Sequence, residues 1–303
     1  MRQTILILEL GALLWLPIVG CAEQIHNLGG FDGGSWGDLS APDGALRPDL
    51  ASDASAVDAA LVDGATGPQV VIVVTGDPTA KTISDGLAGQ TPRNYRMAFG
   101  AFRALKDLND PAPLELLDYR QAPREVDLSQ RTVVGSASLA SLAAGSYTYG
   151  EVLLTKAQFE VDATIHFAGQ SIAQSITVVA ALSDTTIAGK AWKQGEAQVT
   201  VPIIGQPYNF SLPALPSTAG GTLIQKNGET WMRFAFGKPL LIDPQQPTGA
   251  EAEIIYETYE SFRWQDTQQS GHQPNLFDIT AGLPPLIEPV LNFGATGYRV
   301  ITR

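Results

Sequence analysis

The chain has 303 residues, of which 44% are hydrophobic and 17% are charged, and its formal net charge is −12. This composition is typical of a globular protein with a sizeable core. The basic stripe that phosphate contacts require is missing, so nucleic acid is not an expected partner. The single cysteine excludes an internal disulfide bond, and a folded domain must therefore rely on its core alone.

The first residues have the pattern of an export signal. An apolar run from Ile5 to Val19, interrupted by Glu9, is too short for a membrane span and fits a signal-peptide core. It ends in Ile18-Val19-Gly20-Cys21, which resembles the lipobox of bacterial lipoproteins. In that family the cysteine thiol is diacylglycerylated, the peptidase cleaves just before it, and the new amino terminus is usually acylated. The resemblance implies a lipoprotein signal peptide over residues 1–20 and a lipid on Cys21.

The resemblance also implies a cellular location. Several acyl chains on Cys21 would hold the protein stably at a membrane, which is then its first expected partner. Ala22, rather than Asp, follows the cysteine, as in lipoproteins that are sorted to the outer membrane. We therefore expect a lipid-anchored protein of the cell envelope, located at the outer membrane and facing the periplasm or the cell surface.

Residues 21–68 are expected to form a disordered, lipid-anchored tether. The segment is rich in Gly, Ala, Asp, Ser and Pro, and only Phe31 and Trp36 are aromatic, so it buries too little apolar area to fold. Acidic residues recur every four to six positions, namely Asp32, Asp38, Asp43, Asp49, Asp53, Asp58 and Asp63. This spacing does not match a calcium-binding EF-hand loop. As a flexible coil, the tether would hold a domain roughly 40 Å from the membrane.

From residue 69 the pattern changes to the alternation of β-strands. Residues 159–167 are the clearest case, because Phe159, Val161, Ala163, Ile165 and Phe167 alternate with polar residues. Other expected strands are 70–74, 95–105, 132–138, 151–155, 172–182, 197–203, 231–236, 253–264 and 298–301. Turn clusters separate them at 109–111, 144–146, 227–228 and 271–274.

About ten strands with few helical stretches predict a mainly β fold, either an antiparallel β-sandwich or an open barrel. One domain over residues 69–303 is favoured, and the Pro- and Gly-rich stretch 205–221 marks a possible subdivision. Residues 138–148 also resemble a strand–turn motif of β-sandwich domains in bacterial lipoproteins, which supports the same fold.

The sequence contains no recognisable metal or nucleophile motif. His166 and His272 are the two histidines outside the tether, and they form no zinc-binding pair with each other or with a cysteine. Glu160, Asp162 and His166 share the polar face of one strand, but Asp162 and His166 lie about 13 Å apart along it. We therefore expect a solvated face there, no metal and no cofactor.

Two groups of residues are candidates for binding. Trp231, Tyr256 and Trp264 are aromatic side chains near carboxylates, a pattern that suits sugar rings, although the same side chains often pack in the cores of β-sandwiches. The turn-rich segment 265–293 contains Asp266, His272, Asp278 and Glu288, and irregular segments over a β scaffold often carry function.

Two functions follow from these patterns. The first is a non-catalytic binding or structural module that recognises a glycan or an envelope protein. The second is a secreted hydrolase whose carboxylate pair, or calcium-assisted site, is assembled by folding. A folded arrangement of Asp266, His272, Asp278 and Glu288 within mutual reach would favour an enzyme or a metal site, whereas exposed Trp231 and Trp264 would favour glycan binding.

Overall fold

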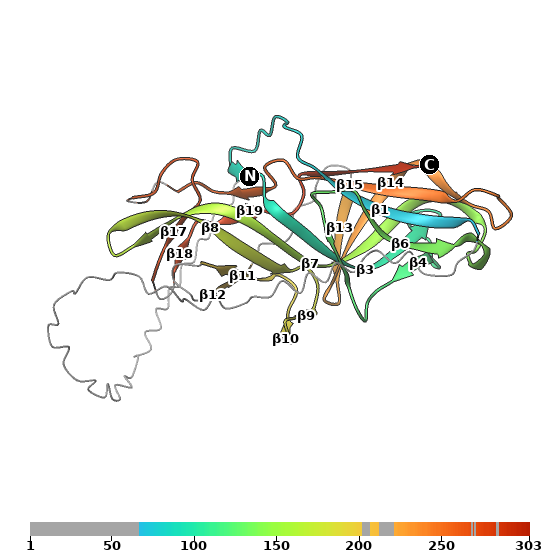
Figure 1. Ribbon diagram of the computed structural model, residues 1–303, viewed down its shortest axis with the longest axis horizontal. Coiled ribbons are helices and arrows are strands. Elements are labelled where there is room, and N and C mark those ends of the chain that lie inside the picture. The colour runs from blue at the N-terminus through green and yellow to red at the C-terminus, as the bar shows by residue number, and fades with distance from the viewer. Residues whose placement is uncertain (1–66, 202–206, 212–220, 268, 270, 283–284) are drawn as a thin grey trace, which may run out of the picture. The chain divides into compact units, whose positions relative to one another are not determined.

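The computed structural model describes residues 67–201, 207–211, 221–267, 269, 271–282 and 285–303 (Figure 1). The expected signal peptide, Cys21 and nearly all of the expected tether lie outside these residues, as does most of the stretch 205–221. The described residues all belong to one compact unit. None of the described helical segments has the length and apolar character that crossing a bilayer would need.

The fold is mainly β, as expected, and its largest sheet has 11 strands. Six of them form its main path in the order β12, β11, β8, β7, β14, β13, and five more pair alongside. The path comprises β12 (Pro207–Ser211), β11 (Glu196–Thr200), β8 (Gln170–Ala181), β7 (Gly145–Phe167), β14 (Glu229–Ile242) and β13 (Gly221–Lys226). The others are β3 (Arg93–Leu105), β4 (Leu114–Asp118), β5 (Arg124–Asp127), β17 (Asp278–Thr280) and β18 (Leu286–Ile287).

Three smaller sheets complete the fold. The four-stranded sheet has the order β20 (Gly297–Thr302), β15 (Ala250–Glu257), β1 (Gln69–Asp77), β6 (Thr132–Ser138). The three-stranded sheet has the order β19 (Val290–Asn292), β16 (Phe262–Trp264), β2 (Ala88–Gln90). The hairpin of β9 (Thr185–Ile187) and β10 (Lys190–Trp192) and the short 3-10 helix η1 (Leu139–Ser141) account for the rest. In the described chain no sheet closes into a barrel.

The main core lies between the large sheet and the smaller sheets. Apolar side chains of β1, such as Ile72, share one cluster with Val152 of β7 and Met232 of β14. Aromatic rings join the layers, since Phe99 of β3 lies 6.1 Å from Tyr256 of β15. Sheets packed face to face in this way form a sandwich, in which inward side chains of both layers share the core.

β7 is the central strand of the large sheet and 23 residues long. Its first half lies between β3 and β14, and its second half pairs with β8 on one side and with the short parallel strand β17 on the other. In Figure 1, β17 and β18 lie beside β8, at the opposite end from β4 and β6. The end of β7 therefore brings residue 166 next to residues more than 100 positions later in the chain.

Several strand predictions are confirmed and others need correction. The Asn227-Gly228 turn is confirmed between β13 and β14, where both residues have positive φ, as a two-residue hairpin requires. The turn expected at 144–146 is wrong, because β7 already begins at Gly145. The strand expected over 253–264 is two strands, β15 and β16. Phe167, expected to face the core, is 59% exposed because it lies at the tip of the β7–β8 hairpin.

Candidate functional site

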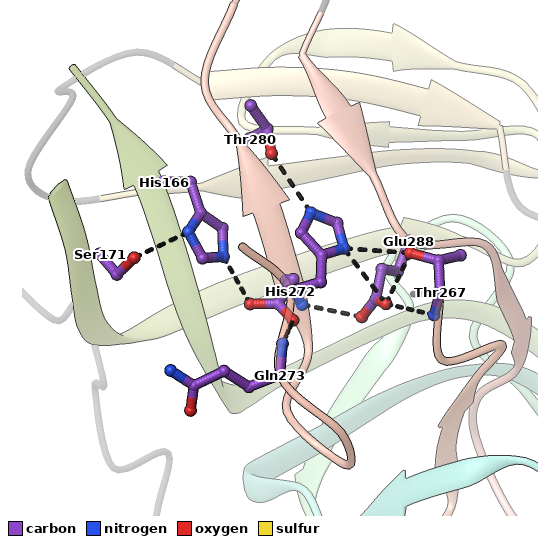
Figure 2. A network of polar contacts seen from close by, with 8 residues as sticks. His166, Ser171, Thr267, His272, Gln273, Thr280 and Glu288 are labelled. Carbon is purple, nitrogen blue, oxygen red and sulfur yellow. Dashed lines mark hydrogen bonds and ion pairs between the residues drawn. The ribbon is translucent and has the colours of Figure 1, made fainter. Parts of the chain in front are cut away.

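Polar side chains from three strands and one loop converge at the end of β7 (Figure 2). His166 lies directly opposite Ser171 of β8 in the antiparallel pair and opposite Thr280 of β17 in the parallel pair. The β7–β8 turn sets the first register, because Ala168 and Gly169 both have positive φ and form a two-residue turn. Asp278 precedes Thr280 by two residues, so both side chains point to the same face of β17.

His166 connects the surface to a buried carboxylate. Its Nε2 lies 2.7 Å from Oδ1 of Asp278, whose side chain is 0% exposed, and its Nδ1 lies 2.9 Å from Oγ of the exposed Ser171. The backbone N–H of Gln273 donates to the other oxygen of Asp278 at 2.9 Å. An ionised Asp278 accepts from both groups, which fixes the proton of His166 on Nε2 and leaves Nδ1 free to accept from Ser171.

A second histidine and a second carboxylate lie next to this pair. The ring of His272 stacks on that of His166 with centroids 5.2 Å apart. Its Nδ1 lies 3.0 Å from Oγ1 of Thr267 and 3.6 Å from Oε1 of Glu288, and its Nε2 lies 3.3 Å from Oγ1 of Thr280. The side chains of His272 and Glu288 are 1% and 0% exposed.

Glu288 is held by neutral donors. Its Oε1 accepts from the backbone N–H and the hydroxyl of Thr267 at 2.7 and 3.0 Å, and its Oε2 accepts from the backbone N–H of Asp278 at 2.9 Å. These three hydrogen bonds fix the position of the carboxyl group. One potential metal-ligand atom from each of His272, Asp278 and Glu288 lies within 4.8 Å of the other two. We call His166, His272, Asp278 and Glu288 the histidine–carboxylate network.

The structure brings some of the polar binding candidates together and leaves one outside. His272 and Asp278 belong to the network, together with Glu288. Asp266 does not take part in its described contacts, and its Oδ2 instead accepts from the backbone N–H of Asn275 at 2.7 Å. The irregular segment after β16 therefore brings some of its polar residues together, as its composition suggested.

Of the two alternatives for the aromatic candidates, core packing holds and the exposed platform does not. Trp264 and Tyr256 are both 0% exposed, and Trp264 packs against Phe262 and Phe277 in the main core. Burial raises the pKa of the Tyr256 hydroxyl well above its ordinary value. Trp231 is 5% exposed and lies in a separate cluster with Ala101 and Leu153. None of the three rings offers a free face to a sugar.

Trp231 adjoins a second buried charge. Glu151 of β7 has a side chain that is 0% exposed, and it lies opposite Arg103 of β3 and Arg233 of β14 in register. Each arginine donates its Nε–H to a different oxygen of Glu151. The guanidinium of Arg103 also lies 3.9 Å from the centroid of the Trp231 ring. In this cluster, which we call the arginine–glutamate cluster, two arginines compensate the one buried carboxylate.

The sequence missed the partners of His166. Its strand pattern placed His166 on a solvated face with Asp162, and the structure instead pairs Asp162 with Arg93. Ser171 and Thr267 carried no motif, and only the parallel pairing of β17 with β7 brings Asp278 to His166. A separate cavity of about 610 Å³, lined by Lys238, Leu241 and Arg303 among others, contains no residue of the network.

No family model matches this chain, and neither a curated protein nor a solved structure matches it. The network supplies two imidazoles and two buried carboxylates, and the exposed hydroxyl of Ser171 lies against it.

Proposed function

We propose that this protein is a cell-envelope lipoprotein, anchored through a lipid on Cys21, whose β domain is a non-catalytic binding or structural module. The observation that carries the anchor is the tetrapeptide Ile18-Val19-Gly20-Cys21 after an apolar run, in a chain without another cysteine. Residues 22–68 then act as the tether, and the domain begins at about Gln69, where the first described strand starts.

The ligand of this module is an envelope protein. Buried Trp264 and Tyr256 remove the stacking surface that a glycan would use. Three exposed apolar side chains instead lie near the network: Phe167 at 59%, Leu276 at 40% and Leu286 at 48%. Leu286 pairs with Thr280, which in turn pairs with His166, so these residues belong to neighbouring strands. Side chains alternate along a strand, so Phe167 points to the face opposite His166, and it and Leu286 lie on the two sides of this end of the sheet. Exposed apolar side chains in such a place are candidates for contact with a protein partner.

The anchor is tested by intact-mass analysis of the chain purified from membranes. The mass should correspond to cleavage before Cys21 plus added lipid. Cys21→Ser should leave the chain without lipid and release it from the membrane fraction. A wild-type chain that keeps Met1, or that carries no lipid mass, contradicts the anchor.

The binding surface is tested with the full chain on isolated envelope proteins and on peptidoglycan sacculi. Phe167→Ser combined with Leu286→Ser should abolish retention of a specific envelope protein. Leu108→Ser is the matched control, because Leu108 is 49% exposed in the turn after β3, outside this surface. Equal retention by both variants contradicts the surface, and retention on sacculi alone identifies a glycan ligand instead.

One observation favours the second candidate, a secreted hydrolase. Ser171, His166 and Asp278 form a relay in which a hydroxyl meets an imidazole that is held by a buried carboxylate. This is the set of roles found in serine hydrolases, with the two ring nitrogens exchanged. Ser171 Oγ would attack an ester carbonyl and pass its proton to His166 Nδ1, which returns it to the departing alcohol. Water then releases the acid from Ser171.

This relay replaces the hydrolase site that the sequence suggested. Asp278 and Glu288 are a carboxylate pair, but both are 0% exposed, so no substrate reaches them as an acid and a base. A fluorophosphonate should add covalently to wild-type chain and not to Ser171→Ala. Ser175→Ala is the control, because Ser175 is exposed on the same strand. An unmodified wild-type chain excludes this second candidate.

A further inference from the structure

The network holds more buried negative charge than its described partners compensate. The side chains of Asp278 and Glu288 are both 0% exposed, and their acceptor atoms converge within 4.8 Å of His272. Among the described residues, neither carboxylate forms an ion pair with a lysine or an arginine, and His166 and His272 are their basic partners. Buried charges in proteins are paired or coordinate metals, because an isolated buried charge is costly.

Other buried carboxylates of this chain show what full compensation looks like. Glu151 has two arginines, and Glu253, with a side chain 7% exposed, pairs with Arg131 and Arg303. Arginine is always charged, so these groups are neutralised at every physiological pH. His272 can instead present an unprotonated nitrogen, which is a metal ligand.

We propose that His272, Asp278 and Glu288 bind a divalent transition-metal ion of the zinc type. His272 Nδ1 and Glu288 Oε1 lie 3.6 Å apart. Two ligands of a tetrahedral zinc ion with bonds of about 2.0–2.2 Å are separated by about that distance, so one ion can bind both atoms. Asp278 of β17 has an oxygen within 4.8 Å of a potential ligand atom of each of these residues, and a small shift of its side chain brings it to the same ion.

The residues around these ligands have the arrangement of an outer coordination shell. If His272 Nδ1 binds the ion, its Nε2 carries the proton and donates to Thr280 Oγ1 at 3.3 Å. Asp278 is oriented by His166 Nε2 and by the backbone N–H of Gln273. Metal-binding histidines and carboxylates are held by outer hydrogen bonds of this kind, which fix the tautomer and the orientation of each ligand.

The donor set selects the class of ion. Calcium takes six to eight oxygen ligands at about 2.3–2.6 Å, and the imidazole nitrogen of this site does not suit it. One imidazole with two carboxylates suits zinc and its first-row neighbours. The metal proposal uses neither Phe167 nor Leu286 as a ligand, so it stands or falls independently of the proposed protein ligand and of the lipid anchor.

The test uses the full chain, treated with chelator and then titrated with Zn²⁺ or Ca²⁺ alone. We expect retention of one zinc ion per chain after dialysis, measured by elemental mass spectrometry, and no retention of calcium. Co²⁺ should give visible absorption bands of a bound ion, and added Zn²⁺ should abolish them. A wild-type chain that retains no zinc and gives no cobalt bands overturns the proposal.

Variants locate the site. Glu288→Gln and His272→Gln should each weaken zinc binding by more than about 100-fold, whereas Asp266→Asn should leave it unchanged, because Asp266 lies in the same loop and outside the ligand set. Far-ultraviolet circular dichroism checks that each variant keeps its β structure. Zinc that remains bound with full affinity in both folded ligand variants places the ion elsewhere and overturns the assignment. If both variants unfold, the cobalt spectrum of the wild-type chain decides whether the protein binds a metal ion, and its absence overturns the proposal.

Discussion

Two clusters of buried charge lie along the same strand, and they are neutralised in different ways. Near the start of β7, Glu151 lies between Arg103 of β3 and Arg233 of β14. Near its end, His166 lies between Ser171 of β8 and Thr280 of β17, with Asp278 as its acidic partner. In both places cross-strand register brings the partners together.

The difference lies in the bases. Arginine keeps its charge and binds a carboxylate with a rigid fork, so the arginine–glutamate cluster is a permanent part of the fold. Histidine can bind a metal through an unprotonated ring nitrogen, so the histidine–carboxylate network can accept an ion that the arginine–glutamate cluster cannot. The arginine–glutamate cluster therefore stabilises the sheet, whereas the histidine–carboxylate network is the candidate functional site.

The largest expected effect comes from breaking the permanent cluster. Arg103→Met should lower the free energy of unfolding by about 3 kcal/mol, because the buried Glu151 loses one of two arginine partners and Trp231 loses the nearer of its two guanidinium contacts, the other being Arg120 at 5.8 Å. Urea unfolding of the full chain measures the change.

The matched control is Arg120→Met. Arg120 pairs with Glu115 and Asp118, and all three side chains are at least about a third exposed, so the change should be below about 1 kcal/mol. If Arg103→Met costs no more than Arg120→Met, Glu151 does not depend on its arginines and the comparison between the clusters fails.

The histidine–carboxylate network should respond to metal where the arginine–glutamate cluster does not. Zinc at about 100 times its dissociation constant should raise the free energy of unfolding of the wild-type chain by about 2.7 kcal/mol. Glu288→Gln should abolish this gain, and in chelator it should cost only about 1 kcal/mol for the changed hydrogen bonds. Thermal unfolding with and without zinc measures both. A variant that gains as much from zinc as the wild-type chain contradicts the role of Glu288.

A weaker effect should appear at the outer hydrogen bond of His272. Thr280→Val keeps the shape of the side chain and removes the hydroxyl that faces His272 Nε2. Loss of such a partner weakens metal binding about 10- to 100-fold. Zinc titration measures the shift, and Thr280→Ser, which keeps a hydroxyl at this position, should recover the affinity if the loss is not a structural defect. An unchanged affinity would mean that Thr280 does not orient the ring.

The sequence predicted much of the fold because single strands follow local rules. Alternation located β7 over 159–165 and β6 at 132–138, and the Asn227-Gly228 pair located a hairpin. It could not show that 151–155 and 159–167 are one strand, because the buried face of β7 shifts from Val152 and Leu154 to Ala157 and Phe159. A register irregularity of this kind depends on the neighbouring strand β3.

The candidate site was predictable only in part for the same reason. Composition singled out the segment 265–293, which contains His272, Asp278 and Glu288, since polar residues in a turn-rich segment stand out. Their partner His166 could not be assigned, because a parallel pairing across more than 100 residues leaves no local pattern. The aromatic candidates could not be recognised as core residues, because burial depends on partners from distant segments: Trp264 packs against Phe277 as well as against Phe262 of its own strand.

The smallest effect concerns a buried polar group with neither a charge nor a partner, which sharpens the contrast with both clusters. The Tyr256 hydroxyl is buried and has no hydrogen-bond partner among the described residues. Tyr256→Phe should therefore leave the free energy of unfolding unchanged at neutral pH or raise it by about 1 kcal/mol.

The same hydroxyl should make stability depend on pH. Burial raises the pKa of Tyr256, so above the ordinary tyrosine pKa the unfolded chain loses this proton first. Its contribution to stability is thus complete below that pKa and is lost as the pH rises. Urea unfolding near pH 8 and about pH 11 should show a smaller alkaline loss for Tyr256→Phe than for the wild-type chain. Equal losses would mean that the hydroxyl ionises as readily in the folded chain, and so is not isolated from water.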